Sequence, residues 1–139
     1  MPAKTRKVLD SFALLAFVRD EPAAEQVEAL LRRARVEDRP LLINEINLGE
    51  CYYILAKEDS VTIAEGFLRR VQTQPIQTVG NRLAEVLDAA RIKARFPISY
   101  ADAFVVATAQ RANAAVITGD PEFRAVSHLV DIDWLPQAV

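Results

Sequence analysis

The sequence has little cysteine and histidine and no long apolar run. Only Cys51 and His128 represent these two types, so the chain cannot form an internal disulfide or a Cys/His zinc site. Any metal site within it must therefore use oxygen ligands. No stretch approaches the roughly 18 apolar residues of a membrane span. The apolar segment after the basic start is interrupted by Asp10 and does not resemble a secretory signal, so we expect a cytoplasmic protein without membrane association.

The chain also has no large excess of positive or negative charge. The 139 residues include 17 Lys+Arg and 19 Asp+Glu, and the net charge of −2 excludes a polybasic nucleic-acid arm and an acidic tail. The apolar content of 51% with 26% charged residues is typical of a folded protein and excludes disorder. The four glycines do not form a phosphate-binding loop. We expect one domain over residues 1–139.

Short apolar runs alternate with helical patterns along the chain. The runs, bounded by turn residues, predict strands at residues 8–9, 41–43, 76–79, 115–118 and 130–134. Between them, an amphipathic stripe begins near Pro22, and further helices have these expected N-cap residues: Asn44, Ser60, Asn81 and Ser99. Strands without polar alternation, separated by helices, predict an α/β fold of three layers (α/β/α) with a five-stranded parallel sheet.

Four carboxylates stand alone in otherwise uncharged segments. They are the only charged residues in the segments 8–18, 46–56, 96–110 and 112–121, and they are Asp10, Glu50, Asp102 and Asp120. No Lys or Arg has a comparable setting, so ion pairs within these segments cannot neutralise them. An unpaired, partly buried carboxylate is costly. Their isolation therefore points to a function.

The predicted topology brings these four carboxylates to one edge of the sheet. Asp10 and Asp120 follow strands, while Glu50 and Asp102 lie in the early turns of helices that begin at the carboxyl edge. In open α/β sheets the ligand crevice lies beyond that edge. Four like charges in one crevice would partly protonate unless a cation keeps them ionised. Hard divalent ions suit carboxylate ligands, so we expect Mg²⁺ or Mn²⁺, which can activate water against a phosphodiester.

Four sequence blocks resemble the PIN-domain family and, within it, the VapC-type toxins of toxin–antitoxin pairs. These blocks are VLDSFALL, INLGE, ISYADAFVVATAQ and VITGDPEF, in this order along the chain. The resemblance implies a metal-dependent endoribonuclease with a parallel five-stranded sheet. It maps the family's acidic positions onto Asp10, Glu50, Asp102 and Asp120. It also implies a homodimer and inhibition by a small antitoxin protein.

The resemblance further implies polar residues that support the site. Ser11, Asn47 and Thr118 fall where the family often has such residues. Many relatives carry a further Asp at the position occupied here by Glu122, which is longer by one methylene. Among the basic residues, Lys93 and Arg95 precede the helix of Asp102 and are our candidates for contacting RNA phosphates. Cations at the end of a helix also offset its macrodipole, which is an equally good explanation of both.

Helix capping is an alternative explanation for three of the four isolated carboxylates. Asp120 precedes a proline and Asp10 precedes a helix, so each is a possible N-cap. Ser99 and Asp102 have the spacing of a capping box, with Asp in place of Glu. Glu50 has no such explanation, because it lies within a helix among apolar neighbours. A carboxylate at a helix N-terminus can also bind metal, so the two interpretations are compatible.

Three alternative functions occur on α/β folds with an acidic site. A haloacid-dehalogenase-type phosphatase would need a second Asp at the position of Phe12, and a receiver domain would need an Asp where Val79, Gly80 and Asn81 stand. The third alternative is a module of the same fold that binds RNA or docks a partner without cleaving. The presence of all four acids argues against that loss of activity. The sequence therefore favours a Mg²⁺- or Mn²⁺-dependent endoribonuclease.

Overall fold

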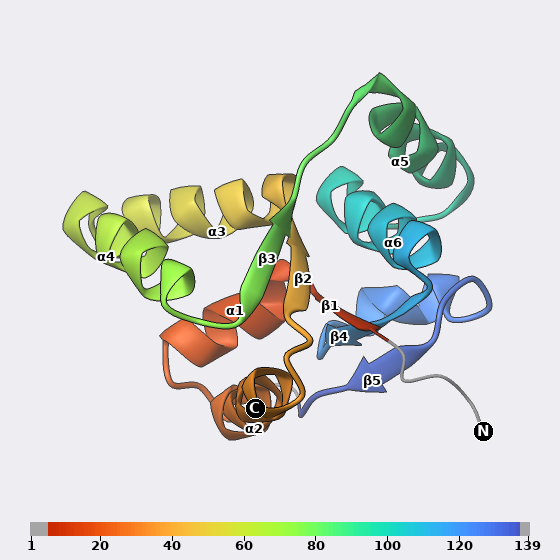
Figure 1. Ribbon diagram of the computed structural model, residues 1–139. Helices are drawn as coiled ribbons and strands as arrows, with labels where there is room; N and C mark the ends of the chain where they lie inside the picture. The colour runs from red at the N-terminus through yellow and green to blue at the C-terminus, as the bar shows by residue number, and fades with distance from the viewer. Residues whose placement is uncertain (1–5, 137–139) are drawn as a thin grey trace.

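Five parallel strands form a sheet with helices on both faces (Figure 1). The computed structural model describes residues 6–136. The strand order is β3-β2-β1-β4-β5, so the first strand occupies the centre. In chain order the elements are β1 (Arg6–Leu9), α1 (Ser11–Val18), α2 (Ala24–Val36), β2 (Leu41–Asn44), α3 (Glu45–Glu58), α4 (Val61–Gln72), β3 (Ile76–Val79), α5 (Leu83–Arg95), α6 (Tyr100–Ala112), β4 (Ala114–Thr118), the 3₁₀ helix η1 (Pro121–Val126) and β5 (Ile132–Trp134). The expected α/β class and parallel five-stranded sheet are confirmed.

The two faces of the sheet are covered by different helices. Alternate residues of the strands point to opposite faces: Leu9 and Ile117 pack with α1–α4, whereas Val8 and Val116 pack with α5, α6 and η1. Figure 1 shows these two helical layers on either side of the sheet. β2 and β4 are buried along their whole length, as are Val8 and Leu9 of β1, so these strands contribute to the core of both layers.

Local capping signals place most helix starts correctly. The side chains of Asn44, Ser60 and Ser99 each accept a hydrogen bond from a backbone N–H in the first turn of α3, α4 and α6. The prediction for Asn81 is wrong, because Arg82 is the N-cap residue of α5. The side chain of Asn81 instead pairs with that of Asn44 through two hydrogen bonds of 2.8 and 2.9 Å.

The last predicted strand is shorter than expected. β5 begins at Ile132 rather than at residue 130. Val130 is buried in the core that α5, α6 and η1 share, so its apolar character reflects packing before the strand begins. Within residues 6–136, no helix is long and apolar enough to cross a membrane.

The carboxyl edge of the sheet gathers the starts of several helices. α1 follows β1 after Asp10, α3 follows β2 directly, and η1 follows β4 after Gly119 and Asp120. β1 and β4 are paired in register, Leu9 opposite Ile117, so the residues after these strands are brought side by side. Helix α6 runs back into β4 from the same edge. The fold thereby brings segments distant in sequence to one place.

Candidate active site

Asp10 is the most deeply buried of the four carboxylates, with 1% of its surface exposed. It caps α1 by accepting a hydrogen bond of 2.8 Å from the backbone N–H of Ala13. Its other oxygen accepts a hydrogen bond from the hydroxyl of Thr118 on β4. Burial raises the pKa of Asp10 to about 8, and the nearby charges of Asp102 and Asp120 add to that rise. Asp10 therefore caps α1 and also lies near two other carboxylates.

Asp102 lies in the first turn of α6 and is also buried. Burial raises its pKa to about 7, and repulsion from Asp120, Glu122 and Glu50 contributes to the same rise. The raised pKa values mean that the carboxyl groups of Asp10 and Asp102 tend to hold a proton near neutral pH. A cation placed between them would reverse that tendency.

The capping box expected at the start of α6 forms only in half. The hydroxyl of Ser99 accepts a hydrogen bond of 3.1 Å from the N–H of Asp102, as the sequence predicts. The reciprocal bond is made by another residue, because the N–H of Ser99 donates to Oε1 of Glu122 at 2.8 Å. The carboxylate of Asp102 is therefore not the group that caps this N–H.

Asp102, Asp120 and Glu122 form an acidic cluster. Each offers one carboxylate oxygen, and these oxygens lie within 4.8 Å of one another. Asp120 also caps η1 by accepting a hydrogen bond of 2.9 Å from the N–H of Glu122. Its own N–H donates to the hydroxyl oxygen of Thr118 at 3.0 Å. Thr118 therefore contacts both Asp10 and the backbone of Asp120.

Glu50 reaches the same region from α3. Its Oε1 accepts a hydrogen bond of 2.5 Å from the hydroxyl of Ser11 at the start of α1. Its charge contributes to the raised pKa of Asp102, so the two groups interact electrostatically. Glu50 also contributes to the raised pKa of the neighbouring buried Cys51, whose largest cause is burial. Ser11, which follows Asp10 in the chain, thus links Glu50 to the start of α1.

Asn47 joins the helices of Glu50 and Asp102. It is fully buried, and its Nδ2 donates a hydrogen bond of 3.0 Å to the carbonyl of Ala101. Among the described residues, its Oδ1 has no hydrogen-bond partner. A buried acceptor without a partner is costly unless water or an ion satisfies it. This oxygen adds to the oxygen-rich character of the region between α3 and α6.

The residues present fit a hard divalent cation. The donors are carboxylate oxygens, supplemented by hydroxyl and amide oxygens, which Mg²⁺ and Mn²⁺ prefer. Burial, together with neighbouring like charges, raises the pKa of Asp10 and Asp102, so added positive charge would favour their ionised forms. The unpaired Oδ1 of Asn47 points to the same need.

Lys93 and Arg95 are not brought into contact with this acidic cluster by any interaction that the structure records. Both side chains are exposed in the last turn of α5. The guanidinium of Arg95 lies 5.6 Å from the ring centroid of the adjacent Phe96. Their place at a helix end agrees with the macrodipole explanation and leaves them accessible to solvent.

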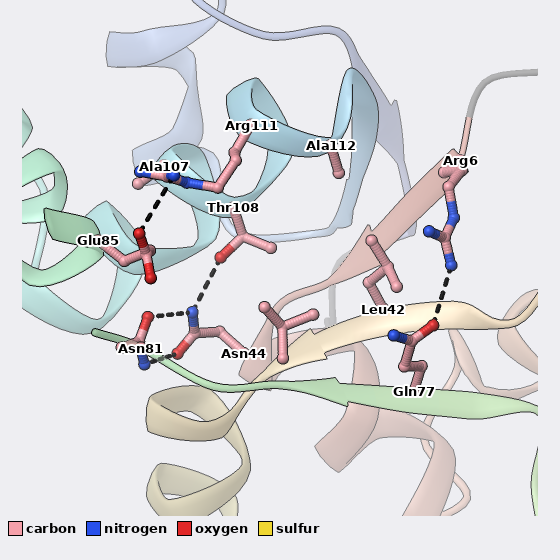
Figure 2. A pocket seen from close by; sticks show the side chains of 11 residues that line it. Arg6, Leu42, Asn44, Gln77, Asn81, Glu85, Ala107, Thr108, Arg111 and Ala112 are labelled. Carbon is pink, nitrogen blue, oxygen red and sulfur yellow. Dashed lines mark hydrogen bonds and ion pairs between the residues drawn. The ribbon is translucent and has the colours of Figure 1, made fainter.

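A separate cavity lies between β2, β3 and α6 (Figure 2). Its volume is about 150 Å³, and apolar side chains such as Leu42 and Ala107 form part of its lining. At one end, Asn44 donates to Oδ1 of Asn81 and to the hydroxyl of Thr108, as Figure 2 shows. None of the four isolated carboxylates lines this cavity. The acidic residues instead occupy the carboxyl edge of the sheet.

Two contacts at the site were not predicted from the sequence. One is the hydrogen bond from Ser99 to Glu122, and the other is the packing of Phe12 against Gly119. A glycine between the predicted strand residue Thr118 and Asp120 was a signal that another group approaches the backbone there. No local signal identified Phe12 as that group.

The sheet and its covering helices are shared with solved toxin–antitoxin proteins. VapBC2 from Rickettsia felis, bound to a promoter DNA fragment, is 12% identical with a TM-score of 0.76, covering 94% of this chain and 99% of that chain. DNA-bound VapBC from Salmonella typhimurium is 14% identical with a TM-score of 0.71, covering 94% and 98%. VapC20 from Mycobacterium tuberculosis, a toxin that cleaves the sarcin-ricin loop, is 12% identical with a TM-score of 0.64, covering 79% and 86%.

Sequence comparisons give the family directly. A comparison with curated proteins finds no match. The family model described as PIN domain matches residues 7–129, which include all four isolated carboxylates. This match confirms the resemblance seen in the four sequence blocks: the chain belongs to the PIN-domain family.

Proposed function

We propose that this protein is a Mg²⁺- or Mn²⁺-dependent endoribonuclease and the toxin of a toxin–antitoxin pair. The observation that carries the proposal is the convergence of isolated carboxylates at one edge of the sheet. Asp10, Asp102 and Asp120 come from three different segments, and Asp102 and Asp120 both contribute to the raised pKa of Asp10. Membership of the PIN-domain family and a fold shared with VapBC proteins support the same activity.

Four carboxylates would hold the metal in this proposal: Asp10, Glu50, Asp102 and Asp120. When bound, a divalent ion supplies positive charge that favours deprotonation of water and stabilises the leaving oxygen of a phosphodiester. Burial raises the pKa of Asp10 and of Asp102, so added positive charge would favour the ionised form of both. Thr118 and Ser11 hold the carboxylates of Asp10 and Glu50 in place through their hydroxyl groups.

RNA cleavage with controlled metal tests the activity. Single-stranded and structured RNAs would be incubated with the protein under added Mg²⁺ or Mn²⁺ and, in parallel, under excess EDTA. We expect cleavage only with metal, and a loss of at least about 100-fold for Asp10→Asn and Asp102→Asn. Glu25→Gln is the matched control, because Glu25 is an exposed acid on α2. Full metal-dependent cleavage by Asp102→Asn would refute the assignment.

We further propose that a small antitoxin protein binds the chain and blocks cleavage. The support is the fold shared with VapBC complexes from two organisms. Co-expression with a small protein encoded beside this gene should give a stable complex and remove RNase activity. Co-purification without inhibition would refute the inhibitory role.

We also propose that the protein forms a homodimer, so that the remaining partner is a second copy of this chain. On α5, Leu83 and Leu87 are 71% and 41% exposed and are one helical turn apart, so they form an apolar face that a second copy would cover. Light scattering coupled to size-exclusion chromatography should give twice the mass of 15.5 kDa. The double variant Leu83→Glu/Leu87→Glu should shift it to a monomer. A wild-type chain that is monomeric at micromolar concentration would refute this part.

A further inference from the structure

Glu122 connects two elements of the candidate site. It lies in η1, directly after the turn that carries Asp120, and its Oε1 accepts the backbone N–H of Ser99 at 2.8 Å. Ser99 is the N-cap residue of α6, the helix that carries Asp102. The contact therefore fixes the start of the Asp102 helix to the Asp120 turn.

The hydrogen bond between Ser99 and Glu122 also frees the carboxylate of Asp102 from a capping role. In a complete capping box the residue at the third helical position reaches back to the N–H of the N-cap residue. Asp102 holds that position, and its N–H is bound by the hydroxyl of Ser99 at 3.1 Å. Glu122, 23 residues further along the chain, takes the reciprocal bond in its place. The carboxylate of Asp102 is thereby left available for a ligand.

Side-chain length is essential to this contact. The backbone of Glu122 is held by its own N–H, which donates to Oδ1 of Asp120 at 2.9 Å. An aspartate at this position would be shorter by one carbon–carbon bond, about 1.5 Å. It would therefore keep the negative charge but lose the bond to Ser99. A glutamine would keep both the length and the acceptor oxygen but lose the charge.

We propose that Glu122 is a positioning residue that releases Asp102 from capping α6 and orients it toward the metal. The proposal rests on the metal site of the proposed function. A carboxylate oxygen of Glu122 lies within 4.8 Å of oxygens of Asp102 and Asp120, so a role as a ligand is the competing explanation. The two roles make opposite demands, because positioning requires length and an acceptor, whereas ligation by charge requires a carboxylate.

Three full-length variants separate the two roles: Glu122→Gln, Glu122→Asp and Glu122→Ala. Hydrogen exchange of the Ser99 amide would be measured by NMR on metal-free protein, and Mn²⁺ affinity by calorimetry without RNA. We expect Glu122→Gln to keep the protection of Ser99 and to bind Mn²⁺ within about threefold of wild type. Glu122→Asp and Glu122→Ala should lose that protection and bind Mn²⁺ about 10- to 100-fold more weakly.

The opposite pattern would overturn the proposal. If Glu122→Asp binds Mn²⁺ as wild type does and Glu122→Gln does not, the charge matters and the capping bond does not. Unchanged exchange of Ser99 in Glu122→Asp would also overturn it, as would a wild-type chain that binds no Mn²⁺. RNA cleavage is assayed separately, so a chain that shows the expected Mn²⁺ and exchange pattern without cutting RNA would refute the proposed function alone.

Discussion

The aromatic ring of Phe12 packs directly on the backbone of Gly119. A Cβ added to Gly119 would lie 2.7 Å from Cζ of that ring and closer still to Cε1. Gly119 does not have a positive φ, so space rather than backbone conformation requires glycine here. We therefore expect Gly119→Ala to lower the free energy of unfolding by about 1–3 kcal/mol through overpacking. Urea denaturation measures this free energy. In a chain that already carries Phe12→Ala, adding Gly119→Ala should no longer lower the free energy of unfolding, because the ring that the Cβ would meet is gone.

Gly49 provides the control for this prediction. It lies in α3, where an added Cβ would meet nothing within 4 Å. Because alanine is favoured over glycine within a helix, Gly49→Ala should raise the free energy of unfolding by about 0.5–1 kcal/mol. If Gly119→Ala proves equally harmless, the contact with Phe12 is not the reason for glycine at that position.

Replacing Thr118 by valine tests the link between Asp10 and Asp120. Valine has nearly the same shape but lacks the hydroxyl that donates to Asp10 and accepts from the N–H of Asp120. Leaving these buried partners unsatisfied should cost about 1–3 kcal/mol of stability. The hydrogen bond from Thr118 lowers the pKa of Asp10, so that pKa should rise further in Thr118→Val.

Thr118→Ser is the matched control, since it keeps the hydroxyl. Its RNA cleavage should stay within about threefold of wild type, while Thr118→Val should lose at least about tenfold. Equal activities of the two variants, measured at saturating Mn²⁺, would show that the hydroxyl does not organise the site.

The stability of the metal-free protein should fall as pH rises toward 8. The pKa values of Asp10 and Asp102 are raised from 3.8 to about 8 and about 7. Between pH 4 and 8 the native state therefore holds more protons than the unfolded chain, and its stability decreases as these protons are released. Each group contributes up to about 1.4 kcal/mol per pH unit within this window.

Urea denaturation in EDTA from pH 5 to 8.5 measures this dependence. Saturating Mn²⁺ should raise the free energy of unfolding most at the alkaline end, because the ion binds the ionised carboxylates. The double variant Asp10→Asn/Asp102→Asn should make the curve in EDTA flatter. A slope unchanged by that double variant would assign the pH dependence to other groups.

Lys93 and Arg95 should contribute to RNA affinity through phosphate contacts. Binding would be measured over a range of salt concentrations with the Asp102→Asn chain, in which we expect cleavage to be lost. Removing both charges should weaken binding and reduce the slope of log K against log salt by about 1.4, at about 0.7 per phosphate contact on single strands. Arg32→Ala/Arg33→Ala on α2 is the control. Equal slopes for both double variants would leave only the macrodipole explanation for Lys93 and Arg95.

Features encoded by neighbouring residues could be predicted from the sequence. The N-caps Asn44, Ser60 and Ser99 were identified correctly, because each bonds to a backbone group two or three residues away. Asp10 and Asp102 could be identified because each is the only charged residue in an apolar segment. Both segments are buried in the fold, and the two carboxyl groups are buried with them. Their metal-binding role remains a prediction.

Features that depend on distant partners could not be predicted. Asn81 was assigned to the cap of α5 because the sequence does not show Asn44, 37 residues away, as its partner. The same limit applies to Ser99, whose N–H bonds to Glu122 rather than to Asp102. A side chain with several possible hydrogen-bond partners is assigned by tertiary structure, and local pattern describes only the nearest of them.

The central place of β1 also has a consequence for the protein during its synthesis. Thr118, the hydrogen-bond partner of Asp10, follows it 108 residues later in the chain. A growing chain that has not yet reached β4 carries Asp10 and Glu50 but lacks Asp120, and its central strand has no β4 to pair with. Because such distant pairing forms late, the four carboxylates come together only after β4 and Asp120 have been made. The site that we propose therefore cannot form in a chain that stops short of Asp120.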